Sequence, residues 1–372
     1  MSRVIVAGTY DPDFGRNRRL LALLDAAGHD VVRCHVALWR GARYEIPNRR
    51  LISTLARAAA AYPKLVWRFS RSPRGDVVVV LYPGWFDVVV LAPLARLRRM
   101  PVLFDPFISI SDTVVSDRAL VGRGSVLGRL VRAVDRASLR AARRVIADTP
   151  SHADFYADLA RISRERVGVV WVGADDDVFR PRPDVEPGSR RVLFYGTFIK
   201  LHGIDVIVRA AKSLEADDVE VRIIGTGQEE ERVAELLAEL RPANVRRIDH
   251  VSRDQLADEI AAATLCLGIF GTTAKARRVV PNKVFECVAV GRPVITADTE
   301  GIRSAFTDDE IAMVPPGDAE ALADEIRRLL ANPGPRERMA FAARQHYLEE
   351  YATDSLTRDL NAEIEATLRP RR

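Results

Sequence analysis

Short runs of apolar and β-branched residues alternate along the chain with longer stretches whose apolar positions recur every three or four residues. The first pattern predicts buried strands and the second predicts amphipathic helices. Strands are predicted at residues 4–7, 30–35, 77–82, 101–104 and 144–147, and then at 192–195, 219–224, 245–248, 265–270, 293–297 and 312–314. Helices of suitable length lie between most of them. This alternation predicts an α/β protein with parallel, doubly wound sheets.

The same pattern divides the chain into two Rossmann-like domains. Residues 1–180 form the first and residues 191–335 the second, and a stretch rich in proline and glycine at 181–190 is typical of a linker. Residues 336–372 are helical in pattern and have no strand to pair with, so packing back on the first domain is one expected outcome. Ligands of open α/β sheets bind beyond the carboxyl ends of the strands, so a cleft between two facing domains is expected.

Composition excludes several classes of protein. With 48% hydrophobic and 29% charged residues among 372, the chain has enough apolar material for two cores. Its three cysteines are far apart and its six histidines are scattered, so neither a disulfide framework nor a metal site is predicted. The N-terminus lacks the pattern of a secretion signal, which favours a cytoplasmic protein.

One apolar segment, residues 77–95, resembles a membrane span. Pro83, Gly84 and Asp87 interrupt it, and a charge at the centre of a span is costly in lipid. A strand, a turn and a helix from about Phe86 explain the same residues, and we favour this interpretation.

Positive charge is concentrated in the first half of the chain. Residues 1–180 hold 29 Lys and Arg against 18 Asp and Glu, and Glu45 is the sole acid between residues 40 and 74. Such a field attracts phosphates or an anionic membrane surface, which would place the protein at the inner face of the plasma membrane. The alternative is a solvated basic face. Nucleic acid is not an expected partner, because few aromatic residues and no base-reading motif accompany the charge.

Two loops in the first half are candidate sites. The loop after residues 4–7 lacks the G-x-G-x-x-G pattern of dinucleotide-binding domains, but Gly15 and Arg16 place flexible backbone and a cation at a helix N-terminus, where anions are stabilised. A plain turn with a helix cap is the alternative. In the loop after residues 101–104, Asp105 and Asp112 are candidate polar site residues; the alternative is an Asp-Pro turn with a cap.

Loops in the second half are richer in phosphate-binding features. Two glycine-containing loops follow neighbouring predicted strands, and a loop with backbone N–H groups and positive charge can bind a diphosphate. The candidate residues are Gly196, Thr197, Lys200 and His202 in the first loop and Gly225 and Gly227 in the second.

A third candidate lies at the start of a predicted helix, after Pro281 and Asn282. Lys283 in the first turn is electrostatically misplaced unless an anion compensates the helix dipole. Glu286 lies on the same side of the helix, so a local ion pair is the alternative. A carboxylate at this position can also bind the hydroxyls of a ribose.

These residues resemble those of the family 4 glycosyltransferases, which are retaining enzymes of the GT-B fold that use nucleotide-sugar donors. The resemblance runs from about residue 192 to residue 331, through Gly196–Gly203, Gly225–Gly227, Pro281–Glu286 and residues 291–295. Residues 173–181 are also similar to the segment before the family's linker. The first half matches only in architecture and resembles the acceptor half.

The resemblance assigns Glu286 to the second glutamate of the family's E-x7-E motif, which holds the donor ribose, and Gly196 to the glycine that opens the diphosphate loop. Three positions depart from the family: Arg278 replaces the first glutamate, Thr197 replaces an arginine, and His202 replaces a lysine. Lys200 and Lys283 are the candidates to supply the missing positive charge.

The resulting hypothesis is a metal-independent glycosyltransferase without a cofactor. The departing diphosphate would be stabilised by Lys200, His202, Lys283 and loop amides. In the acceptor half, Asp105 or Asp112 could orient the acceptor or the sugar. The resemblance implies transfer with retention to the hydroxyl of a carbohydrate, lipid-linked or small-molecule acceptor, as in polysaccharide, glycolipid or glycoconjugate synthesis. Because Arg278 and Thr197 depart from the family, a nucleotide-sugar-binding protein without transferase activity is the alternative, and a GT-B epimerase is a more distant one.

Overall fold

The computed structural model describes residues 1–38, 51–112 and 125–370, with side chains described from residue 57 onward in the second of these stretches. Within this part, the chain divides into two compact units. The first contains the described residues up to Trp171 and those from Leu356 onward, and the second contains Val172–Ser355. The boundary therefore lies at Trp171, and residues 181–190 belong to the second unit.

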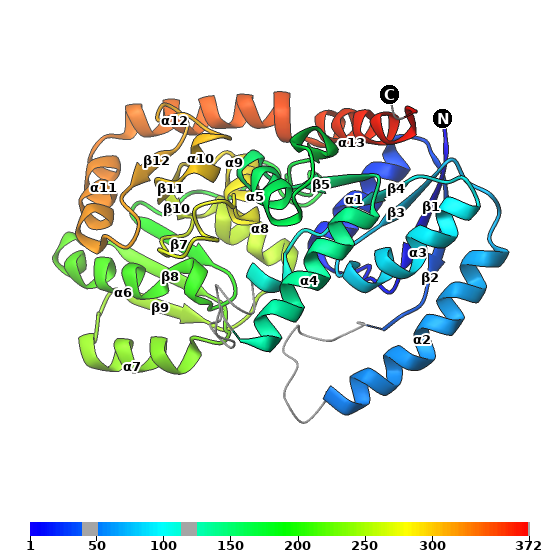
Figure 1. Ribbon diagram of the computed structural model, residues 1–372. Helices are drawn as coiled ribbons and strands as arrows, with labels where there is room; N and C mark the ends of the chain where they lie inside the picture. Colours follow the sequence, from blue (N-terminus) through cyan, green and yellow to red (C-terminus); the bar gives the residue numbers. More distant parts are fainter. Residues whose placement is uncertain (39–50, 113–124, 371–372) are drawn as a thin grey trace. The chain divides into compact units, whose positions relative to one another are not determined.

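The first unit is built on a parallel sheet with the strand order β2-β1-β3-β4-β5-β6 (Figure 1). The strands are β1 (Arg3–Gly8), β2 (Asp30–His35), β3 (Val77–Val80), β4 (Val102–Phe104), β5 (Arg144–Ala147) and β6 (Val167–Val169). The helices are α1 (Gly15–Ala26), α2 (Leu51–Arg71), α3 (Trp85–Leu97), α4 (Val126–Ala141) and α5 (Pro150–Ala160).

Alternation along β1 explains why this sheet is covered on both faces. Ile5 and Ala7 pack into one apolar cluster, and Val4 and Val6 pack into another. Successive side chains of a strand point to opposite faces, so a strand that is apolar at every position requires a layer of helices on each side.

One of these layers includes a helix from the far end of the chain, α13 (Thr353–Leu368). Leu356, Leu360 and Ile364 recur every fourth residue and share a cluster with Val4 and Val6. This spacing forms one apolar stripe on a helix. The C-terminal helix thus completes the core of the first unit.

The second unit has a parallel sheet with the strand order β12-β11-β10-β7-β8-β9. The strands are β7 (Arg191–Tyr195), β8 (Glu220–Ile224), β9 (Val245–Ile248), β10 (Leu265–Leu267), β11 (Val294–Ala297) and β12 (Ala312–Val314). The helices are α6 (Ile204–Ser213), α7 (Glu230–Leu240), α8 (Arg253–Ala261), α9 (Asn282–Val290), α10 (Glu300–Arg303), α11 (Ala319–Ala331) and α12 (Pro333–His346). These two sheets confirm the predicted fold class.

Several local predictions can be compared with these elements. The apolar segment 77–95 is confirmed as a strand, β3, and a helix, α3. Three elements were not predicted from the sequence: β6, α5 and α10. β6 has three residues, and α10 has four. Elements as short as β6 and α10 have no measurable period, because one turn of helix or one pleat is too little to repeat. Length does not explain α5, which has 11 residues.

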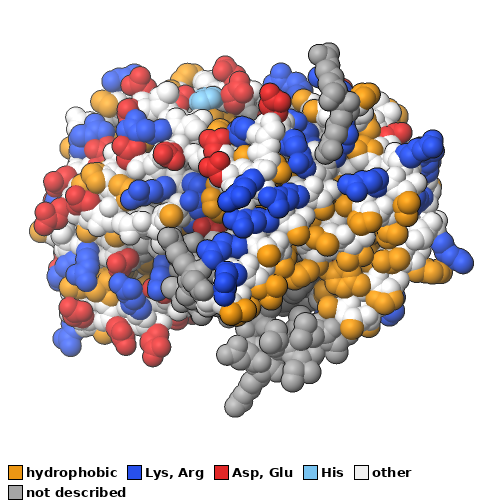
Figure 2. All heavy atoms as spheres, viewed as in Figure 1, with side chains coloured by type: hydrophobic (Ala, Val, Ile, Leu, Met, Phe, Trp, Pro, Cys, Tyr) orange, Lys and Arg blue, Asp and Glu red, His pale blue; other side chains and the backbone are white. Residues whose placement is uncertain are grey.

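The surface of the first unit carries exposed apolar side chains beside basic ones. Val126, Leu127 and Leu130 at the start of α4 are 74%, 53% and 59% exposed. Figure 2 shows hydrophobic and basic side chains on the face that carries α3 and α4. Of the basic stretch 40–74, Arg40, Arg43, Arg49 and Arg50 lie outside the described residues. No helix in the described part of the chain has the length and apolar character needed to cross a membrane.

Candidate functional site

The two glycine loops of the second unit contact each other through their backbones. Gly196 follows β7 and Gly225 follows β8, and both have a positive φ, +141° and +138°. A Cβ on Gly225 would lie 2.1 Å from the carbonyl oxygen of Gly196, so the close approach requires glycine there. Phe198 also donates its N–H to the Thr226 carbonyl at 2.9 Å. The loops therefore meet at the carboxyl ends of β7 and β8.

Lys283 reaches this meeting point from the first turn of α9. A Cβ on Gly196 would lie 3.0 Å from the Lys283 Nζ, and the Nζ lies 3.9 Å from the centroid of the Phe194 ring. The Nζ is buried and has no hydrogen-bond partner among the described residues. Burial lowers the pKa of this ammonium group to about 7, although Cys287 and Glu286 act in the opposite direction. The ammonium group is thus buried without a hydrogen bond to any described residue.

Glu286 is held by a tyrosine. The Tyr195 hydroxyl donates to the Glu286 Oε2 at 2.6 Å. Burial, Cys287 and the Glu286 carboxylate together raise the pKa of Tyr195 well above its ordinary value, so the phenol keeps the proton that it donates. The alternative of a local ion pair between Lys283 and Glu286 is therefore not what the structure shows. Tyr195 was not predicted as a site residue, although its position directly before Gly196 places it at the carboxyl end of a strand, where site residues are expected.

His202 completes this cluster as a neutral group. A Cβ on Gly196 would lie 3.2 Å from its Cε1. Burial and the charge of Lys283 lower the pKa of His202 well below its ordinary value; a hydrogen bond with the Thr197 backbone opposes this, and Lys275 lowers the pKa further. Its Nδ1 has no hydrogen-bond partner among the described residues. A neutral His202 can offer a hydrogen bond to a ligand but no positive charge.

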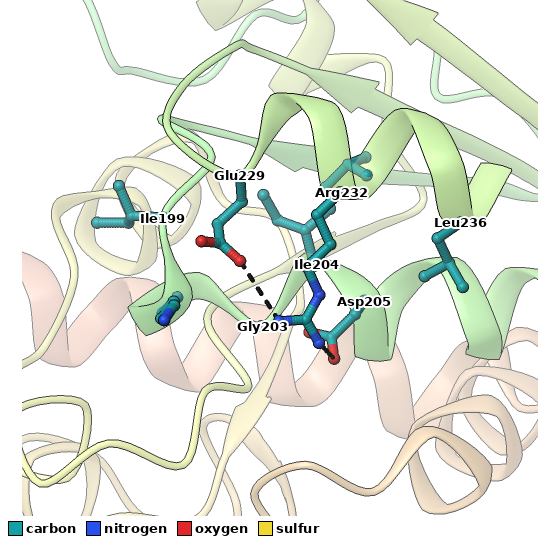
Figure 3. Close-up of a pocket in the computed structure, with 9 residues that line it drawn as sticks. Ile199, Gly203, Ile204, Asp205, Glu229, Arg232 and Leu236 are labelled. Carbon is teal, nitrogen blue, oxygen red and sulfur yellow. Dashed lines mark ion pairs between the residues drawn. The ribbon is translucent and has the colours of Figure 1, made fainter. Parts of the chain in front are cut away.

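The remaining predicted residues of the second unit have different settings. Asn282 is the first residue of α9 and is half-buried, Thr197 is exposed, and a Cβ on Gly227 would lie 2.5 Å from the Phe198 nitrogen. Lys200 is exposed and lines a small cavity of about 20 Å³. Figure 3 shows this cavity, where Arg232 forms ion pairs with Glu229 at 3.6 Å and Asp205 at 3.7 Å. The cavity has room for about one water molecule, so it cannot hold a nucleotide.

In the first unit, two predicted site residues bind each other. The Arg16 Nε lies 3.1 Å from the Asp105 Oδ2, and neither side chain is exposed. Arg16 also donates to the carbonyl oxygens of Val170 at 2.8 Å and Trp171 at 3.0 Å. Burial raises the pKa of Asp105, and Arg16 opposes this. Gly15 begins α1, but Arg16 beside it has no exposed surface with which to contact a phosphate.

A second polar pair follows β5. The His152 Nδ1 lies 2.5 Å from the Asp148 Oδ1, and the His152 ring stacks on Tyr156 with centroids 5.5 Å apart. Burial alone would raise the pKa of Asp148, but His152 and Arg16 lower it below its ordinary value. Asp112, the other predicted aspartate, is buried. His152 was not predicted as a site residue, although it lies four residues after Asp148. This spacing places the two side chains on the same side of the chain where α5 begins.

Within the described part of the chain, no group of three or more His, Cys, Asp or Glu side chains is arranged to hold a metal ion. The geometry instead offers glycine backbone, a buried lysine without a hydrogen-bond partner among the described residues, and an oriented carboxylate.

Comparison with known proteins assigns the family. A family model described as glycosyl transferases group 1 matches residues 189–332, and one described as glycosyl transferase 4-like domain matches residues 16–173. This chain belongs to the family 4 glycosyltransferases, also called group 1. It is therefore an enzyme that takes a nucleotide sugar as donor.

Individual relatives agree with this assignment. The D-inositol 3-phosphate glycosyltransferase 1 of Catenulispora acidiphila is 27% identical over 316 residues, which cover 77% of this chain and 72% of the relative. The D-inositol 3-phosphate glycosyltransferase of Frankia alni is 28% identical over 298 residues, or 70% of each chain.

Solved structures show the fold of this glycosyltransferase. The sucrose-phosphate synthase of Thermosynechococcus elongatus superposes with a TM-score of 0.76 at 20% identity over 98% of both chains. Anabaena Alr3699/HepE in complex with UDP superposes with a TM-score of 0.72 at 13% identity, covering 98% of this chain and 100% of that one. The fold is GT-B.

Proposed function

We propose that the second unit binds a nucleoside diphosphate sugar, with the diphosphate over Gly196 and beside Lys283. The observation that carries this proposal is the buried Lys283 Nζ, which has no hydrogen-bond partner among the described residues and sits 3.0 Å from where a Gly196 Cβ would be. A diphosphate supplies the missing negative charge, and its oxygens accept hydrogen bonds from the loop amides. Glu286, oriented by Tyr195, then accepts hydrogen bonds from the ribose hydroxyls.

The proposed reaction proceeds with retention of anomeric configuration and without a metal ion. The bond between the anomeric carbon and the diphosphate oxygen breaks, and its electron pair stays on the diphosphate. The acceptor oxygen bonds to the anomeric carbon from the same face, and its proton passes to the departing phosphate oxygen. Lys283 stabilises the charge that develops on the leaving group, which is where preorganised electrostatics contributes most. Because His202 is neutral and Lys200 is exposed, Lys283 carries most of this role.

The first experiment is a thermal-shift screen of the full chain against UDP, GDP, ADP, dTDP and NAD. A ligand that binds only the folded state raises the melting temperature by mass action. We expect one nucleoside diphosphate to raise it and NAD to leave it unchanged. A shift with NAD alone would contradict the proposed use of the loops.

The acceptor is the less defined substrate. The named relatives act on D-inositol 3-phosphate, so a cyclitol phosphate is the first acceptor to test, followed by carbohydrate and lipid-linked acceptors. Product formation with retained configuration, followed by NMR in the presence of EDTA, tests the stereochemistry and the independence from metal together. Donor binding without turnover on a broad acceptor panel would favour a binding protein instead.

We also propose that the first unit contacts an anionic membrane surface. Leu127 and Leu130 on α4 are exposed, and so is Arg129 beside them; exposed apolar side chains next to cations are typical of interfacial helices. Vesicles containing phosphatidylglycerol should bind the chain at low salt and release it at high salt. The variant Leu127→Ser with Leu130→Ser should bind less, whereas Phe341→Ser with Leu348→Ser, exposed in the second unit, should bind normally. Equal binding by both variants would refute the contact.

A further inference from the structure

A pocket of about 340 Å³ lies in the first unit where the C-terminal ends of α3, α4 and α13 come together. Five arginines line it, and no acidic residue does: Arg96, Arg99, Arg140, Arg143 and Arg369. Its apolar wall includes Met100, Val102 and Leu368. We call this the arginine pocket. Its volume falls in the range of small-molecule sites.

Helix ends explain only part of this concentration of charge. Arginines near a helix C-terminus can bond the free carbonyl groups there. Arg143 does this, donating its Nε to the Thr367 carbonyl at 2.9 Å, and Arg140 donates to the Ala160 carbonyl at 2.7 Å. The side chains of Arg96, Arg99 and Arg369 make no hydrogen bond or ion pair with any described residue.

Five like charges around one cavity repel each other unless an anion lies between them. Guanidinium groups match phosphate oxygens in pairs of parallel hydrogen bonds, so a phosphate group is the anion that arginines recognise best. The apolar wall at Met100, Val102 and Leu368 gives the remainder of such a ligand a surface to pack on. Together these features are those of a binding site for a small phosphate-bearing molecule.

The arginine pocket is separate from the other polar groups of the first unit. Pro101 and Val102 stand at the amino end of β4, and Arg143 directly precedes β5. Asp105 and Asp148 follow the carboxyl ends of the same two strands. In a parallel sheet the amino ends and the carboxyl ends of the strands lie on opposite sides. A ligand in the arginine pocket therefore does not compete for the groups at Asp105 and Asp148.

We propose that the arginine pocket binds a small phosphate-bearing ligand at a second site, distinct from the donor site. This does not depend on the proposed function, because no residue of the donor site lines the pocket. Thr367, Leu368 and Arg369 form one wall, so an occupied pocket holds the end of α13 against α3 and α4.

Calorimetric titration with sodium pyrophosphate tests the site. Arg96→Gln with Arg99→Gln removes two exposed, unpaired arginines and should weaken pyrophosphate binding at this site at least tenfold. Arg209→Gln with Arg338→Gln removes the same charge from exposed positions of α6 and α12 and should bind as the unchanged chain does. Lys283→Met, which removes charge from the donor site, should keep this binding. Equal affinities for the unchanged chain and the Arg96/Arg99 variant would overturn the proposal.

Hydrogen exchange distinguishes binding in the pocket from nonspecific attraction of an anion to a basic surface. Pyrophosphate should slow amide exchange around residues 366–370 in the unchanged chain, and not in the Arg96/Arg99 variant. Vesicles of phosphatidylglycerol distinguish a lipid headgroup from a dissolved phosphate. If the Arg96/Arg99 variant loses vesicle binding while its affinity for pyrophosphate is unchanged, the pocket is a membrane contact and the proposal of a dissolved ligand fails.

Discussion

Arg16 and Asp105 form an ion pair inside the first unit, with the Arg16 Nε 3.1 Å from the Asp105 Oδ2 and neither side chain exposed. The pair joins the start of α1 to the end of β4, two segments 89 residues apart. Arg16 also bonds the Val170 and Trp171 carbonyls, directly before the boundary between the units. Arg16 therefore stabilises the fold by joining these segments, and its side chain has no exposed surface with which to bind a phosphate.

Replacing Arg16 with methionine should therefore destabilise the first unit. The change leaves the Asp105 carboxylate buried without its partner, which costs about 3–5 kcal/mol in comparable pairs. Urea denaturation followed by circular dichroism measures the loss. The double variant Arg16→Met with Asp105→Asn should recover part of it. If Arg16→Met leaves stability within about 1 kcal/mol of the unchanged protein and weakens ligand binding, the arginine contacts the ligand after all.

Tyr195 and Glu286 should act on the donor as one unit. Glu286→Ala removes hydrogen bonds to a charged group, which are worth about 1.5–3 kcal/mol each, so donor affinity should fall about tenfold to a hundredfold while the melting temperature stays close to normal. Tyr195→Phe frees the carboxylate and should cost less than tenfold. In the Glu286→Ala background Tyr195→Phe should add nothing, because its effect passes through the carboxylate. Calorimetry on the four proteins measures this, and additive losses would separate the two residues.

Lys283 should make the stability of the free protein depend on pH. Its pKa is about 7 in the folded chain against 10.5 for an ordinary lysine, so the unfolded chain binds more protons between these values. Stability therefore increases as pH rises from about 7 to about 10.5, with an upper bound of about 5 kcal/mol for the whole window. Denaturation at pH 7 and pH 9 compares the unchanged chain with Lys283→Met. The variant should lack this increase, and an identical profile would mean that the ammonium is solvated.

Lys283→Met should also separate binding from turnover. In the proposed complex the ammonium faces the leaving diphosphate, whose charge grows in the transition state, so kcat should fall more than donor affinity does. Steady-state kinetics and direct binding measure the two. An equal loss in both would show uniform binding of the donor rather than stabilisation of the leaving group.

Donor binding should take up a proton above neutral pH. At pH 8 Lys283 is mostly neutral in the free protein, since its pKa is about 7, and a bound diphosphate raises that pKa. Calorimetry in two buffers of different ionisation enthalpy should reveal uptake approaching one proton in the unchanged chain and none in Lys283→Met. Uptake that persists in the variant would assign the proton to another group.

The two loop glycines offer a matched pair of substitutions. Gly196→Ala and Gly225→Ala both strain a backbone with positive φ, at a cost of about 1–3 kcal/mol each. The Cβ at position 225 also meets the Gly196 carbonyl at 2.1 Å, whereas the Cβ at position 196 meets the flexible end of Lys283 at 3.0 Å. Gly225→Ala should therefore unfold at lower urea, and Gly196→Ala should stay folded with weakened donor binding. The reverse order would contradict this account of the loops.

Much of the fold could be predicted because its causes are local. The apolar strand runs and the helical period between them indicate alternating elements, and glycines directly after strands mark the loops at the carboxyl ends. The predicted bounds of β2, β5 and α11 agree with the structure to the residue. Lys283 and Glu286 could be placed on one side of a helix from their spacing alone.

Partners across the sheet could not be predicted, because they depend on which strands become neighbours. The sequence places Lys283 within reach of Glu286 on α9, yet Tyr195 at the end of β7 donates a hydrogen bond to the carboxylate. The ammonium group stays buried without a hydrogen-bond partner among the described residues. Asp105 follows β4 and Arg16 lies in the first turn of α1, and only the alignment of β1, β3 and β4 brings the two side chains together and buries them.

The sequence by itself therefore determined the two parallel sheets, the glycine loops and the resemblance to the family, since each depends on residues near one another in the chain. The tertiary structure decided which cation lies beside the Gly196 loop and which carboxylate is oriented. It also decided where five arginines, at or just after the C-terminal ends of α3, α4 and α13, surround one pocket. Periodicity carries information about local backbone conformation and the buried face of each element. The pairing of charges depends on distances that only the packed chain defines.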